Sequence, residues 1–99
     1  MNVSITGKHI DIGAALQDHV RARLTSGVAK YFAGAIEGHV VFSHEGPFYR
    51  AHVSVHVGKG IATEAQGEAS DIYESFNRAA DAAEKQLRRG KRRLRDHQP

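Results

Sequence analysis

The sequence contains no cysteine and no long apolar run. Without cysteine, the chain cannot form a disulfide scaffold, a zinc–thiolate site or a cysteine nucleophile. No apolar stretch approaches the ~20 residues that are needed to span a bilayer. The first residues, Met1-Asn2-Val3-Ser4, lack the basic and apolar segments of a secretory signal. We therefore expect a cytoplasmic protein that does not use a membrane.

The chain is short, and its composition is that of a folded protein. Its 99 residues fit a single domain over 1–99, in which we expect residues 96–99 to form a frayed tail. Hydrophobic residues make up 40% of the sequence, too high a fraction for a disordered chain. A domain of this size buries a small core and has little room for a deep pocket.

The net charge of +3 conceals an uneven distribution. Residues 1–77 contain six bases and eight acids, a net charge of −2, whereas residues 78–99 contain eight bases and three acids, a net charge of +5. Such asymmetry indicates a nucleic acid or an anionic membrane surface. The alternative is a solvated helix end that complements the helix dipole. That effect is confined to the last turn, and these bases extend over about five turns. The distribution favours RNA.

Hydrophobic periodicity predicts four strands and two helices. Residues 48–57 alternate between apolar and polar side chains, which is typical of a strand with one covered face. Shorter patterns predict further strands over 2–6, 36–44 and 61–66, and a helix over 13–32 with Leu16, Val20 and Leu24 on one stripe. Tight turns are expected at 45–47 and 58–60 because both contain glycine.

The second helix carries the basic residues. We expect Ser70 to cap it, with Asp71 in its first turn. Its apolar stripe is predicted to comprise Ile72, Tyr73, Phe76, Ala80, Ala83, Leu87 and Leu94. On the opposite side the pattern places Arg78, Lys85, Arg88, Arg89 and Arg92. Gly90 is expected to mark the point where the helix leaves the body of the protein.

The predicted order, β-α-β-β-β-α, indicates an α+β fold. The first two strands should be parallel because a helix connects them, and strands two to four should form an antiparallel meander. Both helices should pack on one face of the four-stranded sheet, as in a double-stranded RNA-binding domain. Their outer faces and the groove between them would then be exposed.

The seven histidines invite a metal-binding or catalytic hypothesis, centred on His39, His52 and His56. His52 and His56 are about 13 Å apart along one strand, too far to share a metal ion. His39, if it faces Ser54, lies diagonal to both. We therefore predict no enzymatic activity, no metal, no cofactor and no small-molecule substrate. The aromatic residues lie mostly on apolar faces, which favours core packing over base stacking.

Short motifs along the whole chain resemble one family, the bacterial ribosome hibernation-promoting factors, including protein Y. The motifs are Ile5-Thr6-Gly7, Ala15-Leu16, Lys30-Tyr31-Phe32, His56-Val57, Ala65-x-Gly67, Asp71-Ile72-Tyr73, and Gln86-Leu87 followed by a basic run. The resemblance implies the β-α-β-β-β-α fold and binding to the small ribosomal subunit. It also implies that the protein occupies the mRNA and tRNA paths at the decoding region and keeps idle ribosomes inactive.

The resemblance also implies which residues contact rRNA. Arg23 and Lys30 match basic positions of the first helix, and Lys85, Arg89, Lys91 and Arg93 match basic positions of the second. Further charge comes from Arg78, Arg88, Arg92 and Arg95. The chain is similar to a short form of the family, or to the N-terminal domain of a long form. A short form would need a separate ribosome-dimerising factor, whereas a long form carries its own C-terminal dimerisation domain.

Three other functions remain open at this point. The chain could be a double-stranded RNA-binding module without a preference for ribosomes, because shape and phosphates would then suffice for recognition. The histidine face could hold a metal or move protons. The second helix could bind a protein, although its many arginines suit phosphate better.

Overall fold

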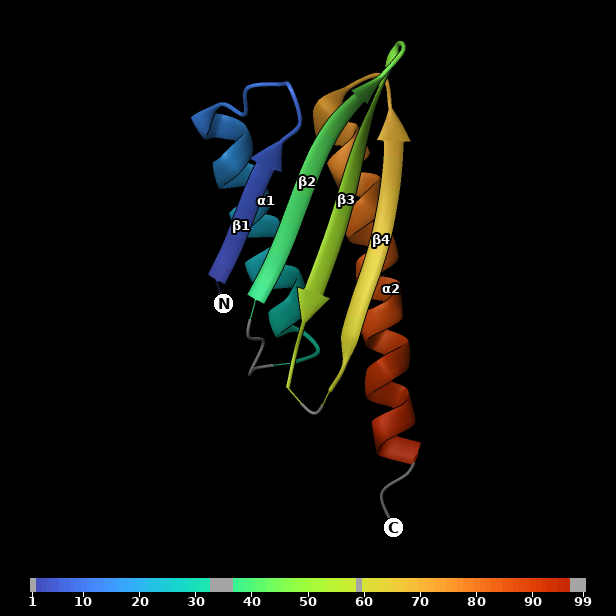
Figure 1. Ribbon diagram of the computed structural model, residues 1–99. Coiled ribbons are helices and arrows are strands. Elements are labelled where there is room, and N and C mark those ends of the chain that lie inside the picture. Colours follow the sequence, from blue (N-terminus) through green and yellow to red (C-terminus); the bar gives the residue numbers. More distant parts are fainter. Residues whose placement is uncertain (1, 33–36, 59, 97–99) are drawn as a thin grey trace.

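The computed structural model describes residues 2–32, 37–58 and 60–96, and for residues 92–96 it describes the backbone alone. Figure 1 shows the elements in the predicted order, and the α+β fold class is confirmed. They are β1 (Asn2–Gly7), α1 (Ala14–Ala29), β2 (Glu37–Glu45), β3 (Phe48–His56), β4 (Ala62–Ala69) and α2 (Ile72–Asp96).

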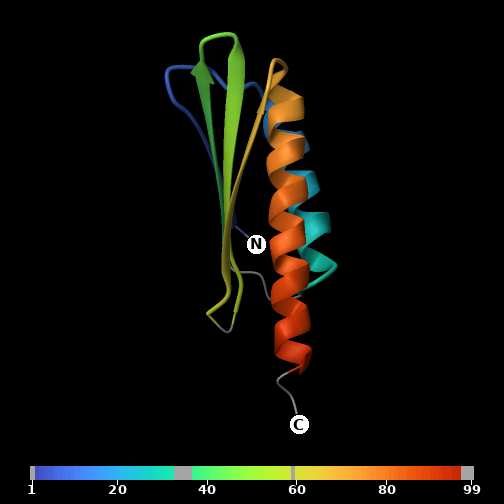
Figure 2. The ribbon, with the colours of Figure 1, turned by 90° about the vertical axis from the view of Figure 1, so that its right-hand side faces the viewer.

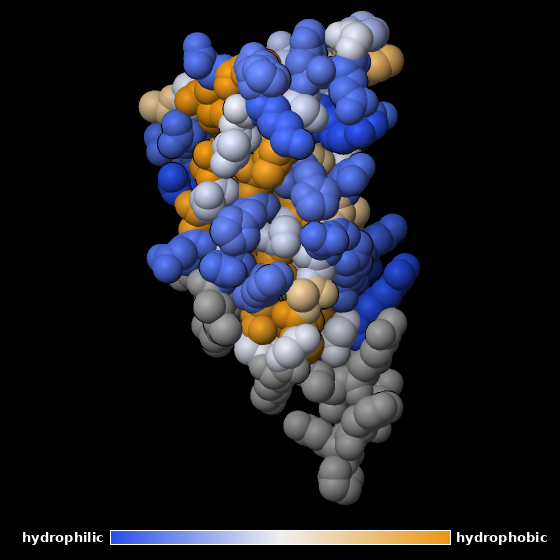
Figure 3. Space-filling view, in the orientation of Figure 1, coloured by the Kyte–Doolittle hydropathy of each residue, from blue (hydrophilic) through white to orange (hydrophobic). Residues whose placement is uncertain are grey.

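The four strands form one sheet in the order β1-β2-β3-β4. Strands β1 and β2 are parallel, whereas β2–β3 and β3–β4 are antiparallel, as predicted. Figure 2 shows both helices on the same side of the sheet, so the molecule has two layers. The other face of the sheet is open and largely hydrophilic (Figure 3). Within the described residues, none of the helices is long and apolar enough to cross a membrane.

The core lies between the sheet and the helices. The alternation in β3 buries Ala51, Val53 and Val55 completely. Phe76 of α2 connects both helices with the sheet. Its ring centroid lies 6.3 Å from that of Phe42 on β2 and 5.7 Å from that of His19 on α1. Burial of such aromatic side chains dominates the energetics of a small core.

Small residues allow α2 to approach β4 closely. A Cβ atom added at Gly67 would meet Ser75 O of the helix, and would lie 2.6 Å from Ala79 N and 2.8 Å from Arg78 Cβ. The first two of these are backbone atoms that cannot rotate away. Glycine at this position therefore sets the distance between α2 and the sheet.

Side chains of both helices cap backbone carbonyls of the two outer strands. Arg21 Nη1 donates to Val3 O of β1 at 3.1 Å. At the other edge, Gln86 Nε2 donates to Glu64 O at 2.8 Å and Arg78 Nη1 to Glu68 O at 2.7 Å. An edge strand with free carbonyls can pair with another chain, so these contacts protect the sheet edges.

Several predicted boundaries were wrong. Helix α1 ends at Ala29 and not at residue 32, because the N–H groups of Tyr31 and Phe32 both donate to Val28 O in a closing turn. Strand β4 continues beyond residue 66 to Ala69. Tyr73, assigned to the apolar stripe, is 37% exposed. The predictions for Ile36, the side chain of Leu94 and residues 97–99 of the tail lie outside the described residues, whereas Asp96 belongs to α2.

Gly90, predicted to mark the point where α2 leaves the body of the protein, lies beside Ile61 near the end of the sheet. A Cβ atom added there would make ordinary van der Waals contact with Ile61, which precedes β4. Beyond this point α2 extends past the end of the sheet (Figure 2). The helix is continuous through Gly90.

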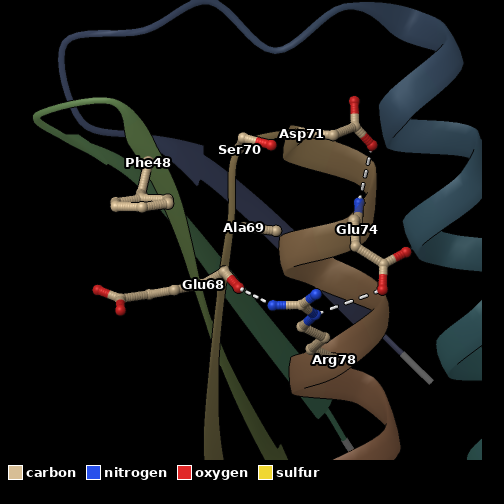
Figure 4. A pocket seen from close by; sticks show the side chains of 7 residues that line it. All are labelled: Phe48, Glu68, Ala69, Ser70, Asp71, Glu74 and Arg78. Carbon is tan, nitrogen blue, oxygen red and sulfur yellow. Dashed lines mark hydrogen bonds and ion pairs between the residues drawn. The ribbon is translucent and has the colours of Figure 1, made fainter.

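The predicted helix cap was wrong by one residue. Asp71, and not Ser70, caps α2: its Oδ2 accepts a hydrogen bond from Glu74 N at 3.0 Å, and its carbonyl accepts one from Ser75 N. Figure 4 shows this cap beside the Ser70 hydroxyl. Because β4 runs through Ala69, Ser70 has to turn the chain before the helix can begin.

Replacing the cap should destabilise the protein. We expect Asp71→Ala to lower the free energy of unfolding by about 0.5–2 kcal/mol, because an N–H of the first turn loses its acceptor. Urea unfolding followed by circular dichroism measures the change. Ser70→Ala serves as the matched control and should stay within ~0.5 kcal/mol of the original protein. Equal losses in both variants would contradict the assignment of the cap.

Candidate nucleic-acid interface

The outward side of α2 presents a surface of three exposed cations, Lys85, Arg88 and Arg89, which we call the α2 basic surface. Leu87 stands between Lys85 and Arg88 in the sequence and is completely buried against the sheet. The three cations therefore lie on the opposite side of the helix. Within the described part of the chain, none of the three forms an ion pair. Unpaired, solvated cations on adjacent turns of one helix suit the phosphates of a nucleic acid.

The next positions of the predicted RNA-binding set follow along the same helix. Lys91 is half-buried. Arg92 and Arg93 belong to α2 by their backbone, and the predictions for their side chains lie outside the described residues. Lys30 is exposed immediately after α1, and no ion pair holds it among the described residues.

Arg23, which was predicted to contact rRNA, forms ion pairs with two acids of α2. Its Nη2 lies 2.5 Å from Asp81 Oδ1 and 3.1 Å from Glu84 Oε2, so it links α1 to α2. The hydrogen bond with Glu84 is the main cause that raises the pKa of the guanidinium above its ordinary value; burial opposes it and Asp81 reinforces it. Only 28% of the Arg23 side chain is exposed. Its positive charge is already matched by carboxylates.

The groove between the helices, which was predicted to be exposed, contains polar and aromatic contacts that join α1 to α2. His19 Nε2 lies 2.9 Å from Asn77 Oδ1, and the His19 ring packs edge-on against Tyr73. Further along the groove, Glu84 occupies the space where a side chain at Gly27 would stand. These contacts join residues that are 58 to 61 positions apart in the sequence, and they hold the two helices side by side.

Arg78 is also engaged within the protein. In Figure 4 its guanidinium points toward the end of β4, where Nη1 donates to Glu68 O at 2.7 Å. Its Nε lies 3.4 Å from Glu74 Oε1, one turn earlier in the same helix. Although Arg78 is exposed, it caps a strand edge, which separates it from the α2 basic surface.

Sequence reasoning missed the role of the acids on α2. Asp81 and Glu84 stand four residues before Lys85 and Arg88, a spacing that normally gives ion pairs within a helix. The structure turns both acids toward Arg23 instead. The spacing between acids and bases was visible in the sequence. That the two acids pair with Arg23 could be found only from the packing of the helices.

Two of the histidines on the open sheet face approach one carboxylate. His39 faces Ser54, as expected, and His39 Nε2 and His56 Nδ1 lie 3.5 Å and 3.7 Å from the same Glu37 oxygen. All three side chains are about half exposed. Over the described ranges, no group of three or more His, Asp or Glu residues is arranged to hold a metal ion.

The sequence profile of the family described as sigma 54 modulation protein / S30EA ribosomal protein matches residues 3–95. The chain belongs to this family. Among S30EA family proteins, the chain is 38% identical over 96 residues to a ribosome hibernation promotion factor of Bradyrhizobium diazoefficiens, and 33% identical over 97 residues to one of Rhizobium meliloti. It is 28% identical to the ribosome hibernation promoting factor of Escherichia coli.

The matched lengths of these S30EA family relatives differ. The chain spans about half of the two rhizobial proteins, 47% and 51% of their lengths, but all of the Escherichia coli protein. Among solved structures, the N-terminal domain of Thermus thermophilus protein Y matches with a TM-score of 0.82 at 30% identity, covering 91% of this chain and 99% of that one. A ribosomal subunit interface protein from Coxiella burnetii has the same fold, with a TM-score of 0.82 at 21% identity over 93% of this chain and 99% of that chain.

Proposed function

We propose that the chain is a ribosome hibernation factor that binds the small ribosomal subunit through its rRNA. One observation carries the proposal: Lys85, Arg88 and Arg89 form an exposed cationic surface without acid partners among the described residues. The names of its relatives supply the ribosome as the partner. In this role the protein is a cytoplasmic regulator without enzymatic activity.

The proposed binding mode uses phosphates more than bases. Arginines and lysines on a helix contact the backbone of RNA and recognise its shape, whereas sequence is read by contacts to base edges. We infer, from what the resemblance of the chain to hibernation factors implies, that this contact lies at the decoding region. There the bound protein would block the mRNA and tRNA paths and inhibit translation by idle ribosomes.

Ribosome pairing requires a further component in this proposal. The chain spans about half of the length of the rhizobial relatives. The function of the other half of those proteins is therefore not assigned to this chain. We propose that the domain inactivates single ribosomes. Dimerisation would then require either a separate factor or a C-terminal domain of a longer protein.

Co-sedimentation tests the proposal. We expect the protein to pellet with purified small subunits at low salt and to be released as salt rises, with log K falling by about 0.7–0.9 per phosphate contact for each tenfold rise in salt. Folded protein that stays in the supernatant at low salt would refute it. Competition with a plain RNA duplex distinguishes a ribosome-specific factor from a general double-stranded RNA-binding module. The general module would move readily from the ribosome to the duplex.

A further inference from the structure

The acids beside the α2 basic surface are spaced to neutralise it. Asp81 precedes Lys85 by four residues, and Glu84 precedes Arg88 by four, the acid-first order that favours ion pairs on a helix. Neither pair forms among the described residues. Both carboxylates instead contact one atom of α1, Arg23 Nη2, at 2.5 Å and 3.1 Å.

We propose that Arg23 is a positioning residue that draws Asp81 and Glu84 away from Lys85 and Arg88, and so leaves these two cations available for phosphate. The inference rests on the proposed function and deepens it. It reassigns Arg23 from an rRNA contact to a residue that acts through the acids of α2.

The burial of the cluster supports this assignment. Arg23 and Glu84 are partly covered, with 28% and 22% of their side chains exposed. Glu84 lies over Gly27 of α1, at the place where any larger residue would collide with it. To contact a phosphate, Arg23 would have to give up two carboxylates, one of which would remain partly buried without its partner. The exposed cations Lys85 and Arg88 carry no such cost.

Arg50 shows the same type of ion cluster away from the helices. Its Nη2 lies 3.0 Å from Glu45 Oε2 and 2.6 Å from Glu68 Oε1 on the open sheet face. Both acids lie on strands, Glu45 on β2 and Glu68 on β4, so neither has a base one helical turn away that it could neutralise. Arg50 is therefore a matched ion cluster in which the proposed effect should be absent.

A mutant cycle distinguishes positioning from direct contact. Arg23→Ala should weaken binding to small subunits roughly threefold to fivefold, because two i,i+4 pairs of about 0.3–0.5 kcal/mol each would then compete with phosphate. In the Asp81→Asn, Glu84→Gln background, Arg23→Ala should have no effect. That background alone should bind at least as tightly as the original protein. Arg50→Ala should leave the affinity unchanged.

Salt dependence provides the second measurement. In the background without the two acids, Arg23→Ala should leave the slope of log K against log salt unchanged, whereas removal of a phosphate-binding group would reduce it by about 0.7–0.9. Equal weakening by Arg23→Ala in both backgrounds, or a reduced slope, would overturn the proposal and make Arg23 an RNA contact. Weaker binding by the acid-free background would also overturn it.

The design separates this inference from the proposed function. If the original protein does not bind small subunits, the proposed function fails. If it binds and Arg23→Ala acts equally in both backgrounds, only the inference fails. Thermal unfolding by circular dichroism checks that every variant is folded. Arg23→Gln, which keeps most of the side-chain stem, replaces Arg23→Ala in the cycle if the alanine variant unfolds.

Discussion

Replacing Arg88 and Arg89 by glutamate is expected to weaken binding to small ribosomal subunits by roughly 100-fold or more. Each charge-assisted hydrogen bond contributes about 1.5–3 kcal/mol, and tenfold in affinity corresponds to about 1.4 kcal/mol. Reversing the charge also introduces repulsion from phosphate. Co-sedimentation over a salt series measures the change, and the slope of log K against log salt should fall by about 0.7–0.9 for each phosphate that the variant no longer binds.

The control for this variant keeps the same change in net charge. Lys8→Glu with Arg21→Glu also exchanges two bases for two acids, and both residues are exposed and lie outside α2. We expect the control to bind far more tightly than the α2 variant. Equal loss in the two double variants would mean that only net charge matters, and would remove α2 as the specific surface. Both variants should remain folded, because surface changes alter stability by about 0.5 kcal/mol and the loss of the exposed Arg21 hydrogen bond to Val3 O adds only about 0.5–1.5 kcal/mol.

Phe76→Ala is expected to lower the free energy of unfolding by about 3–5 kcal/mol. Phe76 is completely buried and contacts β2 through Phe42 and α1 through His19. Its removal would leave a cavity where the two layers meet. For a domain of this size the change corresponds to a fall in Tm of at least ~12 °C, which thermal unfolding followed by circular dichroism would detect.

Phe48→Ala makes the same chemical change at an exposed position. Phe48 begins β3 beside the turn and is 48% exposed. Its loss should cost much less than the loss of Phe76, within ~1 kcal/mol, because much of the ring surface near the turn is already in water. A Phe76→Ala variant as stable as Phe48→Ala would contradict the description of Phe76 as the residue that joins the layers.

Local periodicity predicted most of the fold. The alternation through Val53 and Val55 selected a strand, and the stripe through Leu16, Val20 and Leu24 selected a helix, because both patterns depend only on neighbouring residues. The order of these elements then restricted the sheet to the observed topology. Boundaries were predicted less well. Ser70 and Asp71 are both suitable caps, and the length of β4 determined which of them stands at the helix start.

The sequence predicted a set of RNA-binding cations, and the structure shows which of the described ones are engaged within the protein. The basic helix was evident from charge, and Lys85, Arg88 and Arg89 lie on its exposed side. Arg23 and Arg78 belonged to the same predicted set, but they are engaged with Asp81, Glu84 and the edge of β4. A guanidinium on a long side chain can reach several partners, and the sequence does not state which of them the fold brings near.

The sequence by itself determined the strands, the helices, their order and the position of the cationic segment, because each depends on residues that are close along the chain. The tertiary structure decided which of the described cations on the two helices are paired with acids. Arg23 and Asp81 are 58 residues apart, and they meet because Phe76 and Leu87 bury one side of α2 against the sheet and bring it alongside α1. Charge pairing depends on distances in space of a few ångströms, and only packing sets those distances.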